Sequence, residues 1–205
     1  MKAINKQHLI ELIDLAIKQN GYDCDLNHID VSDIQDMSNL FKNSKFNGNI
    51  SKWNTENVTD TSGMFLMSCY DKPLNLNTSK VTNMNSMFGK SKFNSSLNLN
   101  TSKVTNFGWM FYDSDFDQPL DFIDTSNALN IGFVLYKSRN TQHHTANNWD
   151  VSKVTVFEAA FQSTQLKLDL TDWDVSSGTC MGMMFKNSIM DFYFGKWDVR
   201  KVRNM

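Results

Sequence analysis

The chain repeats one pattern of apolar and polar positions every 23 to 26 residues. A large apolar residue is followed five positions later by an apolar anchor, and seven positions after that by an aromatic or aliphatic residue. The first position holds Ile29, Trp53, Leu76, Leu99, Ile123, Trp149, Trp173 and Trp197. The anchors are Ile34, Val58, Val81, Val104, Ala128, Val154, Gly178 and Val202. The third position holds Phe41, Phe65, Phe88, Phe111, Leu135, Phe161 and Phe185. Because the offsets are fixed, the chain contains eight tandem copies of one unit.

Each copy combines two periodicities. Apolar and polar residues alternate over residues 97–101, which is the period of a β-strand. After Val81 the apolar residues are Met84, Met87 and Phe88, a spacing that predicts a short α- or 3₁₀-helix. Ser79 is placed to cap that helix. We therefore expect each copy to form a strand, a tight turn, a short helix and a return loop.

One such unit cannot bury its apolar face alone, so the copies are expected to stack. The predicted fold is an α/β, leucine-rich-repeat-like right-handed solenoid of about eight coils, each with a short parallel strand and a short helix. Residues 4–19 carry Leu9, Leu12, Ile13, Ala16 and Ile17 on one helical face, and Gly21 follows. We expect residues 1–27 to form an N-terminal cap helix and residues 28–205 the repeats, the last copy being incomplete.

Composition narrows the functional classes. The 205 residues are 40% hydrophobic and 20% charged, with a formal net charge of −2. This balance gives no electrostatic footprint for nucleic acid or an anionic membrane. No apolar run reaches the roughly 18 residues of a membrane span, and residues 1–20 lack the apolar core of a signal peptide. Cys24, Cys69 and Cys180 are far apart, so neither a disulfide framework nor a zinc site is expected, and no cofactor is predicted.

The repeat resembles that of the BspA-like leucine-rich-repeat surface proteins of bacteria. The resemblance covers about residues 28–205 and is carried by WDVSKVT (149–155), TNMNSMF (82–88) and SKFN (91–94). It implies a secreted or lipid-anchored protein that adheres to host proteins, other cells or matrix. The chain has no signal peptide and no lipobox cysteine, which also allows the cytoplasm or another export route. The two localisations stay open at this stage.

Candidate binding residues lie in strand positions that are expected to face outward. One outward column contains Asp30, Asn54, Asn77, Asn100, Asp124, Asp150, Asp174 and Asp198. Its four consecutive aspartates would repel each other unless cations, hydrogen bonds or a basic partner compensate. One interpretation is an acidic strip for a protein partner or a cation such as Ca²⁺. The other is structural, in which each Asp or Asn forms an Asx turn or caps the following helix.

Positions that differ between copies are the better candidates for specificity. In the neighbouring outward column these are Lys52, Phe122, Asn148, Asp172 and Lys196. Residues 137–144 lengthen one copy and are expected to bulge, which makes Arg139, His143 and His144 a candidate contact loop. The two histidines lack a third ligand, so no metal site is predicted there.

No catalytic fingerprint is present, so the sequence predicts a non-catalytic protein–protein interaction or adhesion module. Two alternatives are a polysaccharide-acting β-helix enzyme using Asp150 and Asp174, and a structural spacer. An exported or intracellular effector is a variant of the binding hypothesis. The last copy predicts an exposed apolar end that favours end-to-end self-association, formed by Phe192, Phe194, Trp197, Val199 and Val202.

Overall fold

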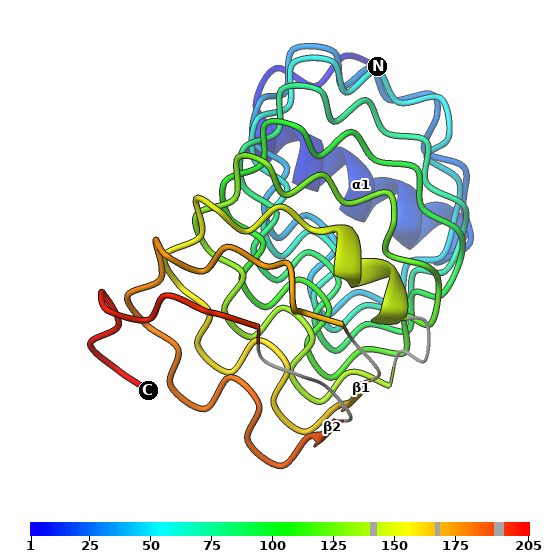
Figure 1. The fold of residues 1–205 in the computed structure, drawn as a ribbon. Helices are drawn as coiled ribbons and strands as arrows, with labels where there is room; N and C mark the ends of the chain where they lie inside the picture. The colour runs from blue at the N-terminus through cyan, green and yellow to red at the C-terminus, as the bar shows by residue number, and fades with distance from the viewer. Residues whose placement is uncertain (140–142, 167–168, 191–194) are drawn as a thin grey trace.

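In the computed structural model, which describes residues 1–139, 143–166, 169–190 and 195–205, the chain winds into coils stacked one on the next (Figure 1). Its two termini lie at opposite ends of the stack. Regular secondary structure is sparse among the described residues. It comprises helix α1 (Lys6–Asn20), 3₁₀-helix η1 (His143–Asn148) and strands β1 (Gln165–Leu166) and β2 (Ile189–Met190). Each copy of the repeat therefore corresponds to one coil held mainly by turns.

Parallel bridges join the coils at the residue two positions after each anchor. The bridged column runs through Asp36, Asp60, Asn83, Asn106, Asn130, Val156, Cys180 and Asn204. On another side of the coils, Asp25 pairs with Asn49, Leu74 with Leu97, and β1 with β2, all in parallel. The parallel pairing agrees with the sequence prediction. The expected strands, however, are mostly single bridges, because the chain turns again within one or two residues.

The prediction of a short helix after each anchor is wrong, because the chain forms a series of turns there. The N–H groups of Met84, Ser86 and Phe88 each donate to a carbonyl of the next coil over 2.9 Å. Between them the chain makes tight turns, such as Met87 N–H to the Met84 carbonyl at 3.2 Å. Ser86 and Lys90 adopt left-handed backbone angles, with φ of 56° and 49°, which a right-handed helix cannot contain. Inter-coil bonds thus satisfy the backbone groups that a helix would have paired internally.

The residue expected to cap that helix has another role. Ser79 donates its backbone N–H to Oδ1 of Asn77 at 3.1 Å and so belongs to the turn before the anchor. The apolar spacing that suggested a helix still marks buried positions, since Met84, Met87 and Phe88 are completely buried. The sequence pattern identified the inward side chains correctly but not the backbone conformation that presents them.

The predicted N-terminal helix is confirmed. Helix α1 begins after Asn5, whose side chain accepts the His8 N–H at 2.9 Å. It ends at Gly21, which has φ of 80° and donates to the Ile17 carbonyl at 2.8 Å. Its buried residues Leu9, Leu12, Ile13 and Ala16 belong to the same hydrophobic core as the coils. The segment before the helix also pairs, because Lys2 bridges Asp30 in the first coil.

Two columns of stacked rings fill the core. In one, the ring centroids of Phe41, Phe65, Phe88 and Phe111 follow each other at 5.6, 5.7 and 5.6 Å. Beside it, Phe46, Tyr70, Phe93 and Phe116 are spaced at 6.0, 6.3 and 6.1 Å. All eight rings are at most 1% exposed. The expectation that equivalent side chains of neighbouring copies touch is therefore confirmed for these columns.

Candidate binding surface

The outward Asp and Asn column forms Asx turns in every copy. In each case Oδ1 accepts the backbone N–H two residues later, at 2.9 to 3.1 Å. The four consecutive aspartates do so with Ser126, Ser152, Ser176 and Arg200. The structural interpretation of this column is thereby confirmed. Its recurrence therefore reflects a turn that each coil makes.

The four aspartates nevertheless form a charged strip. The hydrogen bonds from Ser176 lower the pKa of Asp174 despite the nearby Asp150 and Asp198 carboxylates, which act to raise it. At the end of the strip the Arg200 side chain lowers the pKa of Asp198 to about 2. That guanidinium contacts both carboxylate oxygens, at 2.8 and 2.7 Å. The lowered pKa values of Asp150, Asp174 and Asp198 thus keep these three carboxyls ionised near neutral pH.

The neighbouring outward column lies where the sequence placed it. Lys52, Asn148, Asp172 and Lys196 are exposed, whereas Phe122 is half-buried and packs against the core. These residues share a face with the Asx turns, but they are distributed over coils along the whole stack. The structure does not gather them into one compact site.

The candidate contact loop is described only in part, because residues 140–142 lie outside the described residues. Arg139 is 80% exposed and its Nη1 lies 3.5 Å from Oδ1 of Asp115 one coil earlier. His143 and His144 begin η1. Of the predicted C-terminal apolar end, Phe192 and Phe194 also lie outside the described residues. Trp197 and Val202 are half-buried against the core, and Val199 is exposed.

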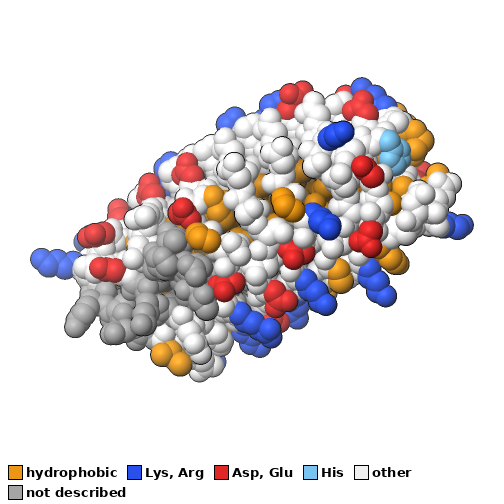
Figure 2. All heavy atoms as spheres, turned by 90° about the vertical axis from the view of Figure 1, so that its right-hand side faces the viewer, with side chains coloured by type: hydrophobic (Ala, Val, Ile, Leu, Met, Phe, Trp, Pro, Cys, Tyr) orange, Lys and Arg blue, Asp and Glu red, His pale blue; other side chains and the backbone are white. Residues whose placement is uncertain are grey.

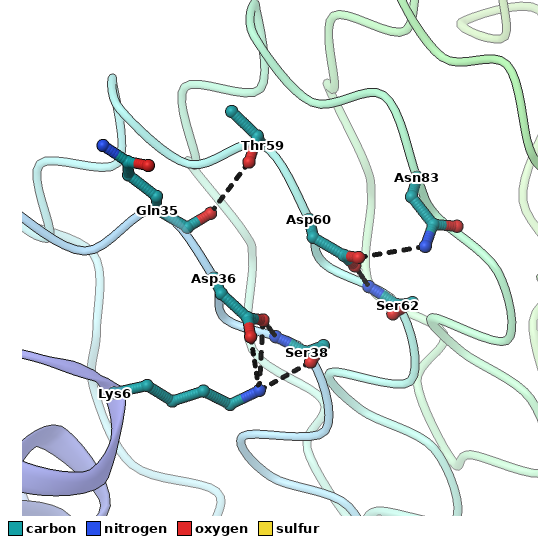
Figure 3. Close-up of polar contacts among 8 residues, drawn as sticks. All are labelled: Lys6, Gln35, Asp36, Ser38, Thr59, Asp60, Ser62 and Asn83. Carbon is teal, nitrogen blue, oxygen red and sulfur yellow. Dashed lines mark hydrogen bonds and ion pairs between the residues drawn. The ribbon is translucent and has the colours of Figure 1, made fainter.

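A second polar ladder, which the sequence interpretation missed, lines the bridged column (Figure 3). Oδ1 of Asp60 accepts the Ser62 N–H at 2.7 Å, and Asn83 Nδ2 donates to Oδ2 of Asp60 at 3.0 Å. At its start, Lys6 Nζ lies 3.0 Å from Oδ2 of Asp36. The signal was visible, since Asp or Asn stands two residues after the anchor in six copies. The bond between Asp60 and Asn83 links two neighbouring coils through their side chains, beside the backbone bridge between the same residues.

The Lys6 contact also explains the ionisation of the Asp36 carboxyl. Partial burial acts to raise its pKa, but hydrogen bonds from Ser38 and Lys6 outweigh burial and hold the pKa below its usual value. Lys6 begins α1, so the ion pair attaches the cap helix to the first coil. This polar cluster has a structural use and needs no ligand to account for it.

Sequence interpretation also missed an aromatic patch, formed by Trp109, Tyr112, Phe133 and Tyr136. The rings of Trp109 and Phe133 are stacked, with centroids 3.8 Å apart and planes 6° from parallel. Tyr112 meets Trp109 edge-on at 5.0 Å, and Tyr136 meets Phe133 edge-on at 5.8 Å. All four side chains are half-buried. The patch is therefore a packed cluster of rings at the surface of two consecutive coils.

Two rings of the aromatic patch are held on unfavourable backbone. Trp109 and Phe133 have φ of 62° and 59°, in the left-handed region where bulky side chains are rare. The equivalent position in other coils holds Asn39, Gly63, Ser86, Ala159 and Met183, mostly residues that are small or polar. Such a conformation costs about 1–3 kcal/mol per residue, while one aromatic pair contributes about 0.5–1.5 kcal/mol. Ring stacking alone offsets only part of this cost.

Cations and a glycine complete the surroundings of the patch. Lys90 Nζ lies 5.8 Å from the centroid of the Tyr112 ring, and Lys137 Nζ lies 5.3 Å from that of Tyr136. A Cβ at Gly89 would overlap the Tyr112 ring, so the missing side chain makes room for it. Partial burial raises the pKa of Tyr112, and the neighbouring Asp113 carboxylate adds to this. Tyr112 therefore stays a neutral hydrogen-bonding group.

Comparison with known proteins identifies the family. Three segments, residues 11–75, 69–165 and 133–205, match the family described as "Mycoplasma protein of unknown function, DUF285". The chain belongs to the DUF285 family. Each match to DUF285 spans at least two copies of the repeat, so the family unit comprises several coils. No curated protein and no solved structure matches this DUF285 chain.

Among the described residues of the DUF285 protein, no group of three or more His, Cys, Asp and Glu side chains is placed to hold a metal ion. Within the same part of the chain, no helix is long and apolar enough to span a bilayer. Figure 2 shows acidic and basic side chains interspersed on one face, with small groups of hydrophobic side chains between them. The aromatic patch is thus the most distinctive candidate surface.

Proposed function

We propose that this DUF285 protein is a non-catalytic protein–protein interaction or adhesion module, in which a solenoid of the leucine-rich-repeat type, related to BspA-like proteins, presents a binding surface. The observation that carries the proposal is the aromatic patch of Trp109, Tyr112, Phe133 and Tyr136 on an otherwise regular stack. Trp and Tyr are enriched among residues that dominate binding energy at protein interfaces. A repeat scaffold supplies the rigid backing that such a surface needs.

The use of the repeated polar side chains supports binding over catalysis. The carboxylates that a hydrolase would need, those of Asp150 and Asp174, accept backbone N–H groups in Asx turns. Their pKa values are lowered by those same turns, with serine hydrogen bonds as the main cause, so they are poor general acids near neutral pH. What distinguishes one coil from another is the aromatic and charged side chains at variable positions.

Affinity capture from the cells that produce the protein tests this proposal. The immobilised chain is expected to retain at least one protein that free chain displaces, identified by mass spectrometry. The matched variant Asp150→Asn with Asp174→Asn keeps the turn acceptors and removes both charges. Release of reducing sugar from a polysaccharide by the wild type, lost in this variant, would instead identify an enzyme. Absence of any displaceable protein would favour a structural spacer.

A further inference from the structure

The two consecutive coils that carry the aromatic patch depart from the repeat at several outward positions at once. Besides Phe133 and Tyr136, the fifth coil has Leu129, which is 48% exposed where neighbouring coils have Thr105 and Thr155. Two coils before the patch, Met67 is also exposed, at 44%. Exposed apolar side chains also occur on other coils, such as Met183 at 55%, so the stacked rings of Trp109 and Phe133 are what distinguish the fourth and fifth coils.

Backbone strain argues that the rings serve more than the fold. Since Ser86 and Ala159 occupy the same turn position in neighbouring coils, the turn does not require an aromatic residue. Side chains kept in the left-handed region despite their bulk are characteristic of functional sites. The stacked Trp109 and Phe133 are held rigidly by the coil-to-coil hydrogen bonds from their own N–H groups, at 2.9 and 2.7 Å. A rigid ring loses little entropy when a partner packs on it.

Charge indicates which partner fits. Lys90 and Lys137 are exposed, and each ammonium group lies over a tyrosine ring of the patch. The coil between them has Asp113 at the equivalent position. The edge of the patch formed by Lys90, Asp113 and Lys137 therefore carries one net positive charge, whereas the whole chain has a formal net charge of −2. The nearby Arg139 is already paired with Asp115. Apolar rings edged by two lysines are complementary to apolar side chains edged by carboxylates.

The stacking also fixes a spacing. The Lys90 N–H donates to the Tyr112 carbonyl at 2.8 Å, and the Asp113 N–H donates to the Tyr136 carbonyl at 2.7 Å, so Lys90 and Lys137 are two coils apart. Two coils correspond to roughly 10 Å, at about 4.8 Å per parallel bridge. In an extended segment lying along the stack, that distance spans about three residues at 3.3 Å each.

We infer that the aromatic patch, with Lys90 and Lys137, binds an extended segment of a protein partner in which apolar side chains lie between two carboxylates about three residues apart. This inference rests on the proposed function and names the site and partner chemistry for it. The rings contact the apolar side chains, and the two ammonium groups pair with the carboxylates at the rim.

Copolymers of defined composition test the inference on the full chain. A random copolymer of glutamate and tyrosine is the probe, compared by thermophoresis with poly-glutamate and with a copolymer of lysine and tyrosine. We expect the glutamate–tyrosine copolymer to bind at least about ten-fold more tightly than either comparison. Binding should weaken as salt is added, because the lysines are exposed. Equal binding of the lysine–tyrosine copolymer, or no binding of the probe, would overturn the inference.

Variants locate the site. Trp109→Ser installs the residue that Ser86 supplies at this turn, so folding is expected to persist and is checked by circular dichroism. Trp109→Ser, and separately Lys90→Gln with Lys137→Gln, should each weaken binding about ten-fold. The matched control, Lys18→Gln with Lys103→Gln, removes the same charge from exposed positions elsewhere and should bind as wild type. If folded Trp109→Ser binds the glutamate–tyrosine copolymer with wild-type affinity, the inference is contradicted. It is also contradicted if the protein binds the oligosaccharide cellopentaose instead of the copolymer and Trp109→Ser abolishes that binding.

Failure of this inference can be told from failure of the proposed function. A protein captured from the native cells that binds wild type and Trp109→Ser equally would remove the aromatic patch as the site, while the proposed interaction function stands. If wild type retains no displaceable protein from those cells, the proposed function itself fails.

Discussion

Trp109 and Phe133 lie in consecutive coils, and their rings are stacked with centroids only 3.8 Å apart. This separation is shorter than the 5.6 to 5.8 Å between equivalent phenylalanines of the core column. The surface pair is therefore more tightly stacked than the core, although both of its residues stand on left-handed backbone. Ring stacking and the coil-to-coil hydrogen bonds hold this conformation in place.

The core columns predict large losses on truncation. Phe88 is completely buried and stacks on Phe65 and Phe111, so Phe88→Ala should lower the free energy of unfolding by about 3–5 kcal/mol. The exposed Met67 is the control, and Met67→Ala should change the free energy of unfolding by less than about 0.5 kcal/mol. Urea denaturation followed by circular dichroism measures both. A Phe88→Ala loss no larger than that of Met67→Ala would be inconsistent with a stacked aromatic core.

The outward aspartates should behave as turn acceptors rather than as charges. Asp150→Ala removes the acceptor of the Ser152 N–H and should destabilise by about 1 kcal/mol. Asp150→Asn keeps an acceptor, as Asn77 does at the equivalent position, and should be nearly neutral. Thermal unfolding of the two variants compares them directly. Equal destabilisation by Ala and Asn would mean that the negative charge, and not the turn, matters.

Acid should destabilise the fold. The pKa values of Asp30, Asp150, Asp174 and Asp198 are lowered in the folded chain, mainly by hydrogen bonds from the residue two positions later. A lowered folded-state pKa contributes stability above the unfolded value, about 3.9 for Asp, and that contribution is lost as pH falls through the folded value. Urea midpoints should therefore decline from about pH 4 downward. Replacing Asp30, Asp150 and Asp174 by Asn should make the urea midpoint decline less steeply below about pH 4.

Close packing between neighbouring coils requires a glycine at position 48. A Cβ at Gly48 would overlap the backbone carbonyl oxygen of Cys24, which cannot move without breaking its bond from the Asn49 N–H at 3.1 Å. Gly48→Ala should thus cost about 1–3 kcal/mol. Gly21→Ala is an informative comparison, because a Cβ there meets nothing within 4 Å and only the φ of 80° opposes it. An unchanged urea midpoint for Gly48→Ala would show that the coils are not packed as described.

The parts of this fold that could be read from the sequence are those set by side-chain burial. The fixed phase of Phe65, Phe88 and Phe111 predicted their contact, because equivalent positions in stacked copies must coincide. The backbone after each anchor could not be read in the same way. Apolar residues spaced three, three and one apart fit a helix as well as a series of turns, and Ser86 or Lys90 gives no local signal of a left-handed conformation.

The aromatic patch was missed for a related reason. A shared template emphasises what the copies have in common, whereas Trp109 and Phe133 stand at a position where other copies have small or polar residues. The useful signal was the exception, two aromatic residues at the same offset in consecutive copies. The outward Asp and Asn column was the candidate binding strip because it recurs in every copy, and it recurs because each coil makes the same Asx turn.

Photo-crosslinking in the cells that produce the protein tests most directly whether the aromatic patch faces a protein partner. Benzoylphenylalanine replaces Tyr112 in one variant and the exposed Asn98, on the Asx-turn face, in the other. The account predicts a discrete protein adduct from position 112 that Trp109→Ser abolishes, and none from position 98. An adduct from position 98 alone, or one from position 112 that persists in folded Trp109→Ser, would contradict it.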